Sequence, residues 1–186
     1  MPLCPKCGAE NRENHVFCQN CDRPLSSLAE EEVGGLREDI LAKWRPFQEY
    51  VMGLFPEASF HLIDSNGGGD ELNGRMESAL RPDLHYRHED SGESFWVKCR
   101  YRTGDPSDRV IWCEEWQLGA YQEFQKRVWP EGIFVVIGTG GAPKDPAELY
   151  CVPLDRLHRP DPDKEWMSGY KRIPGQEFMF HTGWLI

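Results

Sequence analysis

Residues 95–102, FWVKCRYR, alternate strictly between two kinds of side chain, and this alternation restricts what the chain can fold into. Side chains of a β-strand point to opposite faces of a sheet in turn, so the stretch predicts a strand with two unlike faces. The first face takes an apolar set, namely Phe95, Val97, Cys99 and Tyr101. The second face carries a tryptophan followed by three cations, namely Trp96, Lys98, Arg100 and Arg102. A row of three cations needs a reason in a chain whose net charge is −10.

The composition indicates a folded protein with one main domain. A chain of 186 residues has room for one α/β domain and a small appendage. Its hydrophobic content of 39% is enough to form a core. The acidic net charge argues against a general polyanion binder, although a local cationic groove remains compatible with it. No run approaches the ~20 apolar residues of a membrane span and no signal segment begins the chain, so we expect a cytoplasmic protein with no membrane partner.

Four cysteines near the N-terminus have the spacing of a metal site. Cys4, Cys7, Cys18 and Cys21 form a C-x2-C, ten-residue, C-x2-C pattern, which predicts a tetrahedral four-thiolate site for structural Zn²⁺. The alternative is two disulfides, which the missing secretion signal disfavours. The segment resembles the short N-terminal zinc ribbons of many prokaryotic proteins. That resemblance implies an adaptor for protein or nucleic acid, and four thiolates leave no open position for a catalytic water.

The remaining cysteines, Cys99, Cys113 and Cys151, are scattered in apolar runs. We interpret them as buried residues, with a disulfide between two of them as the alternative. The composition divides the chain into four parts: a zinc ribbon (1–24), an acidic flexible linker (25–35), a main domain (36–157) and a C-terminal extension (158–186). The Pro-rich stretch 158–163 is expected to be loosely ordered.

The hydrophobic patterns of the main domain predict an α/β fold with a central mixed β-sheet flanked by helices. The predicted helices cover residues 36–54 and 117–128. The predicted strands lie within residues 55–64, 84–88, 95–102, 109–116, 133–141 and 149–154, with a hairpin turn at residues 90–92.

This order of elements, together with three short motifs, resembles the PD-(D/E)XK restriction-endonuclease-like superfamily. Pro82–Asp83 stands on the first arm of the hairpin. Lys98-Cys99-Arg100 stands on the second arm, with fourteen residues between Asp83 and Lys98. The helix beginning QLGAY matches the glutamine-x-x-x-tyrosine motif of the RecB-like and Holliday-junction-resolvase-like branches, which implies roles for Gln117 and Tyr121. The resemblance spans about residues 36–155 and implies that Asp83 is the first of two carboxylates holding Mg²⁺.

The sequence departs from that family at the two positions that matter most. The second carboxylate is expected at position 98, which is lysine, and the lysine is expected at position 100, which is arginine. Mg²⁺ is held mainly by carboxylates and gives up its water reluctantly, so a cation in place of a carboxylate leaves it without a site. Asp83 is then expected to pair with Lys98 or Arg100. We predict a degenerate catalytic site that can bind a phosphate and cannot hydrolyse one.

Several alternatives remain open at this point. A second carboxylate from elsewhere, with Glu49, Glu77, Glu114 and Glu115 as candidates, would give an active Mg²⁺-dependent DNA endonuclease. A protein–protein adaptor fits the acidic charge, whereas the degenerate site favours a binding module for nucleic acid or a protein. If the family assignment is wrong, the cations form an ordinary exposed face with Trp96 as a partial plug. The sequence leaves the oligomeric state open, and related nucleases often form dimers.

Overall fold

The computed structural model describes residues 3, 10, 43–65, 81–103 and 108–186. The four predicted zinc ligands, the predicted linker and Glu77 lie outside the described residues. The fold below therefore concerns the main domain and the C-terminal residues.

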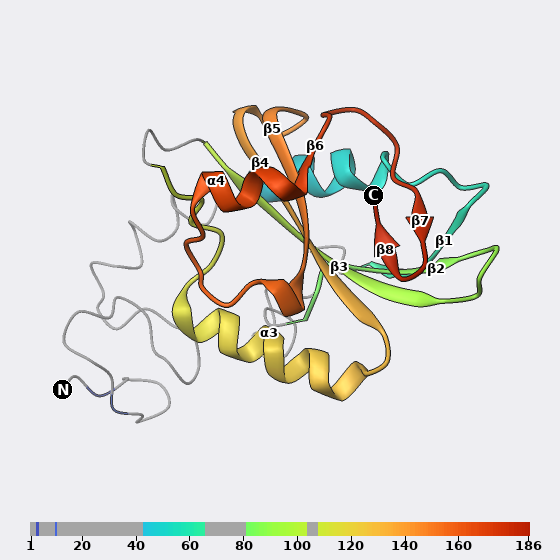
Figure 1. The fold of residues 1–186 in the computed structure, drawn as a ribbon, viewed down its shortest axis with the longest axis horizontal. Helices are drawn as coiled ribbons and strands as arrows, with labels where there is room; N and C mark the ends of the chain where they lie inside the picture. The colour runs from blue at the N-terminus through green and yellow to red at the C-terminus, as the bar shows by residue number, and fades with distance from the viewer. Residues whose placement is uncertain (1–2, 4–9, 11–42, 66–80, 104–107) are drawn as a thin grey trace.

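The centre of the domain is a six-stranded mixed sheet whose strands follow the order of the chain, β1-β2-β3-β4-β5-β6 (Figure 1). The strands are β1 (Phe60–Ser65), β2 (Leu84–His88), β3 (Ser94–Arg102), β4 (Gly132–Ala142), β5 (Asp145–Pro153) and β6 (Lys171–Arg172). Neighbouring strands are antiparallel except β3 and β4, which are parallel. A parallel pair needs a crossover, and α3 (Glu115–Val128) supplies it.

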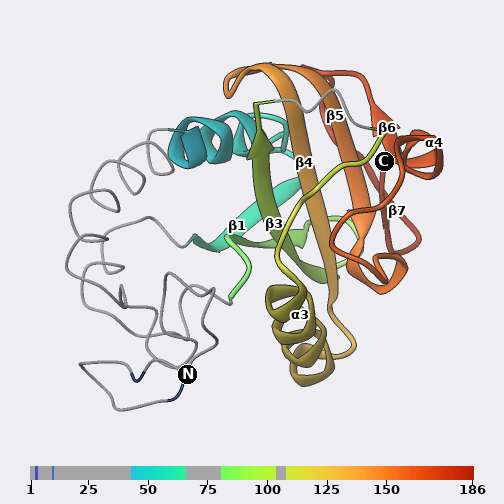
Figure 2. The same ribbon diagram turned by 90° about the vertical axis from the view of Figure 1, so that its left-hand side faces the viewer.

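Helices cover both faces of this sheet, as predicted. The helix of residues 43–52 packs on one face and α3 on the other, so that the sheet lies between them (Figure 2). The short helix α4 (Lys164–Met167) lies near β5 and β6 (Figure 1). None of the helices in the described ranges is long and apolar enough to span a membrane.

Each face of the sheet has its own core. The aromatic core, on the side of residues 43–52, is built around Phe47, Phe55, Phe60, Tyr86, Phe95, Phe134 and Phe178. The α3 core, on the other side, is built around Trp96, Trp112, Leu118, Tyr121, Val135, Ile137 and Met167. Phe95, Val97 and Cys99 belong to the aromatic core and Trp96 to the α3 core, which confirms the predicted alternation of β3.

Residues 109–116 do not form the predicted strand. Arg109 makes one isolated bridge with Asp163, and α3 already begins at Glu115. The Val110 N–H donates to the Pro162 carbonyl at 2.9 Å and the Trp112 N–H to the Pro160 carbonyl at 3.0 Å. Proline has no N–H to return, so a regular ladder cannot form between these segments.

The same two hydrogen bonds correct the expectation for residues 158–163, whose carbonyls hold residues 110–112 in place. The C-terminal residues beyond them complete both cores, because Met167 is buried in the α3 core and Phe178 and Leu185 are buried in the aromatic core. The chain ends in a hairpin of β7 (Phe180–His181) and β8 (Trp184–Leu185). The short 3₁₀ helices η2 (Leu154–Arg156) and η3 (Ser168–Tyr170) connect the last elements of the main sheet.

Candidate functional site

Asp83 lies at the start of β2, directly opposite Lys98 on β3. The Asp83 N–H donates to the Val97 carbonyl at 2.9 Å, which extends the β2–β3 ladder by one residue and fixes the direction of the side chain. Lys98 Nζ donates to Asp83 Oδ1 at 2.7 Å. The Cys99 N–H donates to the other carboxylate oxygen, Oδ2, at 2.6 Å. Both oxygens of Asp83 are therefore engaged by β3.

This ion pair is buried, since the side chains of Lys98 and Asp83 are 5% and 3% exposed. The expected pairing of Asp83 with one of the two cations is thus present in the structure. The row of cations on β3 is, however, not the open floor of a cleft at this position. Lys98 is neutralised and covered, so it has no free charge to offer a ligand.

Tyr121 of α3 covers the next cations along the strand. Arg100 Nη2 donates to the Tyr121 hydroxyl at 2.5 Å. The Tyr121 ring centroid lies 5.5 Å from Lys98 Nζ and 5.9 Å from Arg100 Cζ, both within the range of cation–π attraction. Trp112, fully buried, stacks on the far side of this arrangement with its ring centroid 5.9 Å from that of Tyr121. Arg100 Nε has no hydrogen-bond partner among the described residues.

Gln117 lies one helical turn before Tyr121, where it closes the start of α3. Its side-chain oxygen Oε1 accepts from the Glu114 N–H at 3.0 Å, and its own N–H donates to the Glu114 carbonyl at 3.0 Å. Reciprocal bonds of this kind satisfy backbone groups that a helix N-terminus leaves unpaired. Of the motif glutamine and tyrosine, only Tyr121 contacts the charged row in the structure.

Trp96 lies at the other end of the cationic row on β3. Its Nε1 donates to Glu131 Oε2 at 2.6 Å, and its ring stacks on His85 with centroids 3.9 Å apart and planes 4° apart. His85 Nε2 lies 3.1 Å from the same carboxylate oxygen without forming a hydrogen bond. The Arg81 guanidinium lies 4.8 Å from the Trp96 ring centroid. Trp96 is thus a sealed packing residue rather than a surface for stacking.

The three candidate second carboxylates that the structure describes, Glu49, Glu114 and Glu115, are not gathered around Asp83. Glu49 is on the helix that covers the opposite face, where Lys144 Nζ lies 2.8 Å from Glu49 Oε2 and the hydrogen bond lowers the pKa of that carboxyl. Glu114 and Glu115 occupy the start of α3, and Glu114 lines a pocket beyond Arg102. Among the described residues, no three His, Cys, Asp or Glu side chains come together as a metal site.

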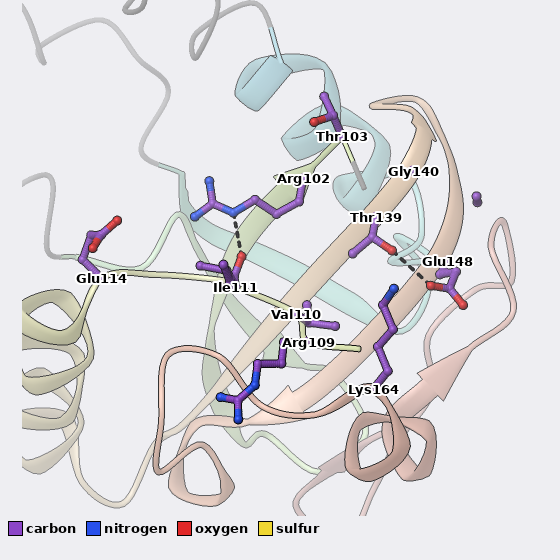
Figure 3. A pocket seen from close by; sticks show the side chains of 11 residues that line it. Arg102, Thr103, Arg109, Val110, Ile111, Glu114, Thr139, Gly140, Glu148 and Lys164 are labelled. Carbon is purple, nitrogen blue, oxygen red and sulfur yellow. Dashed lines mark hydrogen bonds between the residues drawn. The ribbon is translucent and has the colours of Figure 1, made fainter. Parts of the chain in front are cut away.

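The pocket at the end of β3 contains residues that the sequence reading did not bring together. Its volume is about 510 Å³, and Figure 3 shows its walls. The lining comes from β3 and the residues after it, from the start of α3, from β4 and β5 and from α4: Arg102, Thr103, Arg109, Val110, Ile111, Glu114, Thr139, Gly140, Ala147, Glu148 and Lys164. Only the sheet order juxtaposes them, so Arg102, already noted in the cationic row, was the one signal available.

The three described cysteines are buried and free, as predicted. Burial raises the pKa of Cys113 and that of Cys151, each to about 12, and the pKa of Cys99 is also raised by burial. A thiol that stays protonated is neither a nucleophile nor a metal ligand. These residues are core packing and not part of a catalytic site.

No protein-family model matches this chain, and a search of curated proteins found no match. The geometry described above is therefore the basis for any statement about function.

Proposed function

We propose that residues 36–157 form a restriction-endonuclease-like domain whose catalytic site has lost its metal, and that it acts by binding nucleic acid or a protein. The observation that carries the proposal is the buried pair of Asp83 and Lys98, with Arg100 beside it. It occupies the position where the resemblance to that superfamily implies two carboxylates.

The topology supports the fold part of this proposal. A helix, three antiparallel strands, a helix and a strand parallel to the third follow one another in the chain, which is the order on which the resemblance rests. Residues matched to the motif of that superfamily also contact one another, since Lys98 touches Asp83 and Arg100 touches Tyr121.

The donor set supports the loss of metal chemistry. In a metal-dependent nuclease two carboxylates hold Mg²⁺, which lowers the pKa of a bound water and stabilises charge on the phosphate. Among the described residues, one carboxylate is present here, and both its oxygens accept hydrogen bonds from β3. The residues therefore do not fit Mg²⁺, and no hydrolytic step can be assigned to them.

The burial of the pair also argues that it is a remnant of a site. Removing two charges from water costs free energy that their attraction barely repays, and well-packed apolar residues in their place are often as stable or more so. The pair is therefore poorly explained as a stabilising device. A position inherited from a site with two carboxylates explains why charges remain under α3.

The double substitution Lys98→Glu with Arg100→Lys tests the site by restoring the family pattern. If β2 and β3 hold a former metal site, the variant should bind Mg²⁺ at least about tenfold more tightly than the wild type, because a second carboxylate faces Asp83. Arg87→Glu is the matched control, since Arg87 is exposed on β2 and pairs with Glu89. Mg²⁺ titration calorimetry of folded, zinc-loaded protein gives the readout. Equal affinity in the double variant and the control would contradict the proposal.

The binding part is tested separately with DNA. Fluorescence anisotropy of the zinc-loaded protein at low salt, in buffer with no added Mg²⁺, should show salt-dependent DNA binding. Adding Mg²⁺ afterwards should produce no cleavage. If the wild type does not bind DNA under these conditions, the proposed partner is a protein. Mg²⁺-dependent cleavage that Asp83→Asn abolishes would overturn it in favour of an endonuclease.

We also propose that Cys4, Cys7, Cys18 and Cys21 hold a structural Zn²⁺, on the strength of their spacing. Thiol titration tests this directly. The three buried cysteines should stay unreactive in native protein, whereas chelation should release four reactive thiols out of seven, and denaturant should expose all seven. Four thiols that react rapidly before chelation would rule out the site.

A further inference from the structure

The pocket beyond Arg102 lies where a ligand site is expected in a sheet of this kind. Arg102 pairs with Thr139 across the parallel strands β3 and β4, so the pocket sits at their shared carboxyl edge. Ligands of open α/β sheets commonly bind outside the carboxyl ends of parallel strands. The volume of about 510 Å³ is in the range of pockets that hold small molecules.

Hydrogen bonds to the backbone fix the orientation of Arg102 in the wall of this pocket. Its Nε donates to the Ile111 carbonyl at 2.8 Å and its Nη2 to the Trp112 carbonyl at 3.1 Å (Figure 3). These bonds fix the plane of the guanidinium and use one edge of it. Within the described residues, no carboxylate forms an ion pair with Arg102, and Nη1 has no recorded hydrogen bond. The guanidinium is thus a positioned cation with donors left over.

The surroundings make an anion the natural partner for that cation. Partial burial of Arg102, and then the neighbouring positive charge of Arg100, lower the pKa of Arg102, whereas the negative charge of Glu114 raises it. A negative charge near Arg102 therefore stabilises the charged guanidinium, and a bound anion would add to that effect. Lys164 adds a further cation to the lining, and Thr103 and Thr139 add hydroxyl groups. Arg109 also lines the pocket, but it already forms ion pairs with Asp161 and Asp163. Figure 3 shows the Lys164 side chain extending towards Thr139 and Glu148.

Two acids also line the pocket, and their positions limit how they oppose an anion. Glu148 already has a cation of its own, because Lys171 Nζ donates to Glu148 Oε1 at 2.7 Å, and Thr139 Oγ1 donates to its other oxygen at 3.3 Å. Glu114 lies at the start of α3, away from Glu148 and Thr139 across the pocket (Figure 3). Among the described residues, the hydrogen bonds of the Arg102 guanidinium go to two backbone carbonyls.

We propose that this pocket binds a phosphate monoester group, with Arg102 as its principal ligand and Lys164 as a further donor. A planar guanidinium with donors to spare matches phosphate oxygens, and a charge-assisted hydrogen bond is about twice as strong as a neutral one. The group can come from a free mononucleotide or from the 5′ end of a nucleic-acid strand. This site does not depend on the proposed loss of metal at Asp83, because it is built from different residues.

The test is a set of binding titrations with the zinc-loaded full chain. The probes are inorganic phosphate, adenosine 5′-monophosphate, and one oligonucleotide with and without a 5′ phosphate. Wild type should bind the phosphorylated probes, and Arg102→Gln should weaken that binding about tenfold or more through loss of a charge-assisted hydrogen bond. The control Arg87→Gln removes an exposed arginine of β2 and should change the affinity less than about twofold.

The outcomes show whether the site exists and which kind of molecule supplies the phosphate. Binding of the mononucleotide identifies a free ligand, whereas binding of the phosphorylated oligonucleotide alone identifies a strand end. Because Arg102→Gln also removes two bonds to backbone carbonyls, Lys164→Gln serves as a second variant that should weaken binding, and the melting temperature of each variant is measured beside its affinity. No binding of any phosphorylated probe, or equal affinity in wild type and both pocket variants, would overturn the proposal. Failure of the metal tests at Asp83 would leave these results unaffected.

Discussion

The two faces of the sheet differ in composition. Burial of apolar side chains explains one face completely and the other only in part. On the aromatic face, rings pack against rings, as in the stack of Phe55 on Tyr86 with centroids 4.2 Å apart and of Phe95 on Phe180 at 5.0 Å. On the α3 face the same strand, β3, places Lys98 in a buried ion pair and Arg100 against a tyrosine hydroxyl. The first face is a packed core, and the second is a core built around charges.

The contrast distinguishes a face that apolar burial explains from a face that contains buried charges. Apolar burial contributes roughly 25 cal/mol per Å², so the aromatic face needs no further reason. A buried charge pair gains little free energy over apolar residues of the same volume, so the charges on the α3 face need a further explanation. The position of that pair at the β2–β3 hairpin, where metal-dependent nucleases of this topology are expected to hold two carboxylates, supplies the reason that we propose.

The largest expected effect comes from breaking the pair on the α3 face. Asp83→Ala should lower the free energy of unfolding by about 3–5 kcal/mol, because it leaves the Lys98 ammonium buried without its partner. Removing both charges, with Asp83→Ala and Lys98→Met together, should recover much of that loss. Urea unfolding of the two single variants and the double variant measures the coupling. A double variant that loses the sum of the single effects would contradict the account.

A smaller effect is expected from overpacking the aromatic face. A Cβ on Gly138 of β4 would lie 2.4 Å from Phe47 Cε2, a ring at the centre of that core. Gly138→Ala should therefore cost about 1–3 kcal/mol. Phe47→Leu should make room for the new Cβ. This second substitution should therefore lower the free energy of unfolding less in the Gly138→Ala background than in the wild type. Thermal unfolding of the four proteins tests this, and additive effects would show that the two residues do not share the space.

The smallest effect concerns the rim of the pocket. The hydrogen bond from Lys171 lowers the pKa of Glu148 below its usual range. Its contribution to stability is therefore present above the ordinary glutamate pKa of about 4.3 and is lost as the pH falls through the lower folded-state value. Glu148→Gln should remove only a few tenths of a kcal/mol near neutral pH, because the pair is partly exposed. Unfolding at about pH 7 and about pH 3.5 should show a smaller difference for the variant than for the wild type.

Much of the fold could be predicted because β3 and its neighbours carry strong local patterns. The alternation of residues 95–102 and the turn before them gave β2 and β3, and the unbroken apolar run gave β4. The prediction of a strand at residues 109–116 was wrong, since the N–H groups of Val110 and Trp112 donate to proline carbonyls far along the chain and no regular ladder forms. Pairings over such a distance are not visible in a local pattern.

The candidate site was predictable in part for the same reason. Asp83 and Lys98 lie on adjacent strands of one hairpin, so their contact follows from the register. The burial of Lys98 was not foreseen, because it depends on where Tyr121 of α3 settles over the strand. The pocket beyond Arg102 was not foreseen either, because it is assembled from segments of the chain that only the folded sheet brings together.

The measurement that tests the central claim most directly is a calorimetric titration of Mg²⁺ into the zinc-loaded wild type beside Asp83→Asn. Asparagine removes the charge while keeping the shape, and its single oxygen can accept one of the two hydrogen bonds that β3 donates to Asp83. We expect no Mg²⁺ binding in the millimolar range for either protein, because Lys98 already pairs with Asp83, the one carboxylate that the described residues place at this site. One bound ion in the wild type, lost in Asp83→Asn, would show that a second carboxylate joins Asp83 and that the domain is equipped for catalysis.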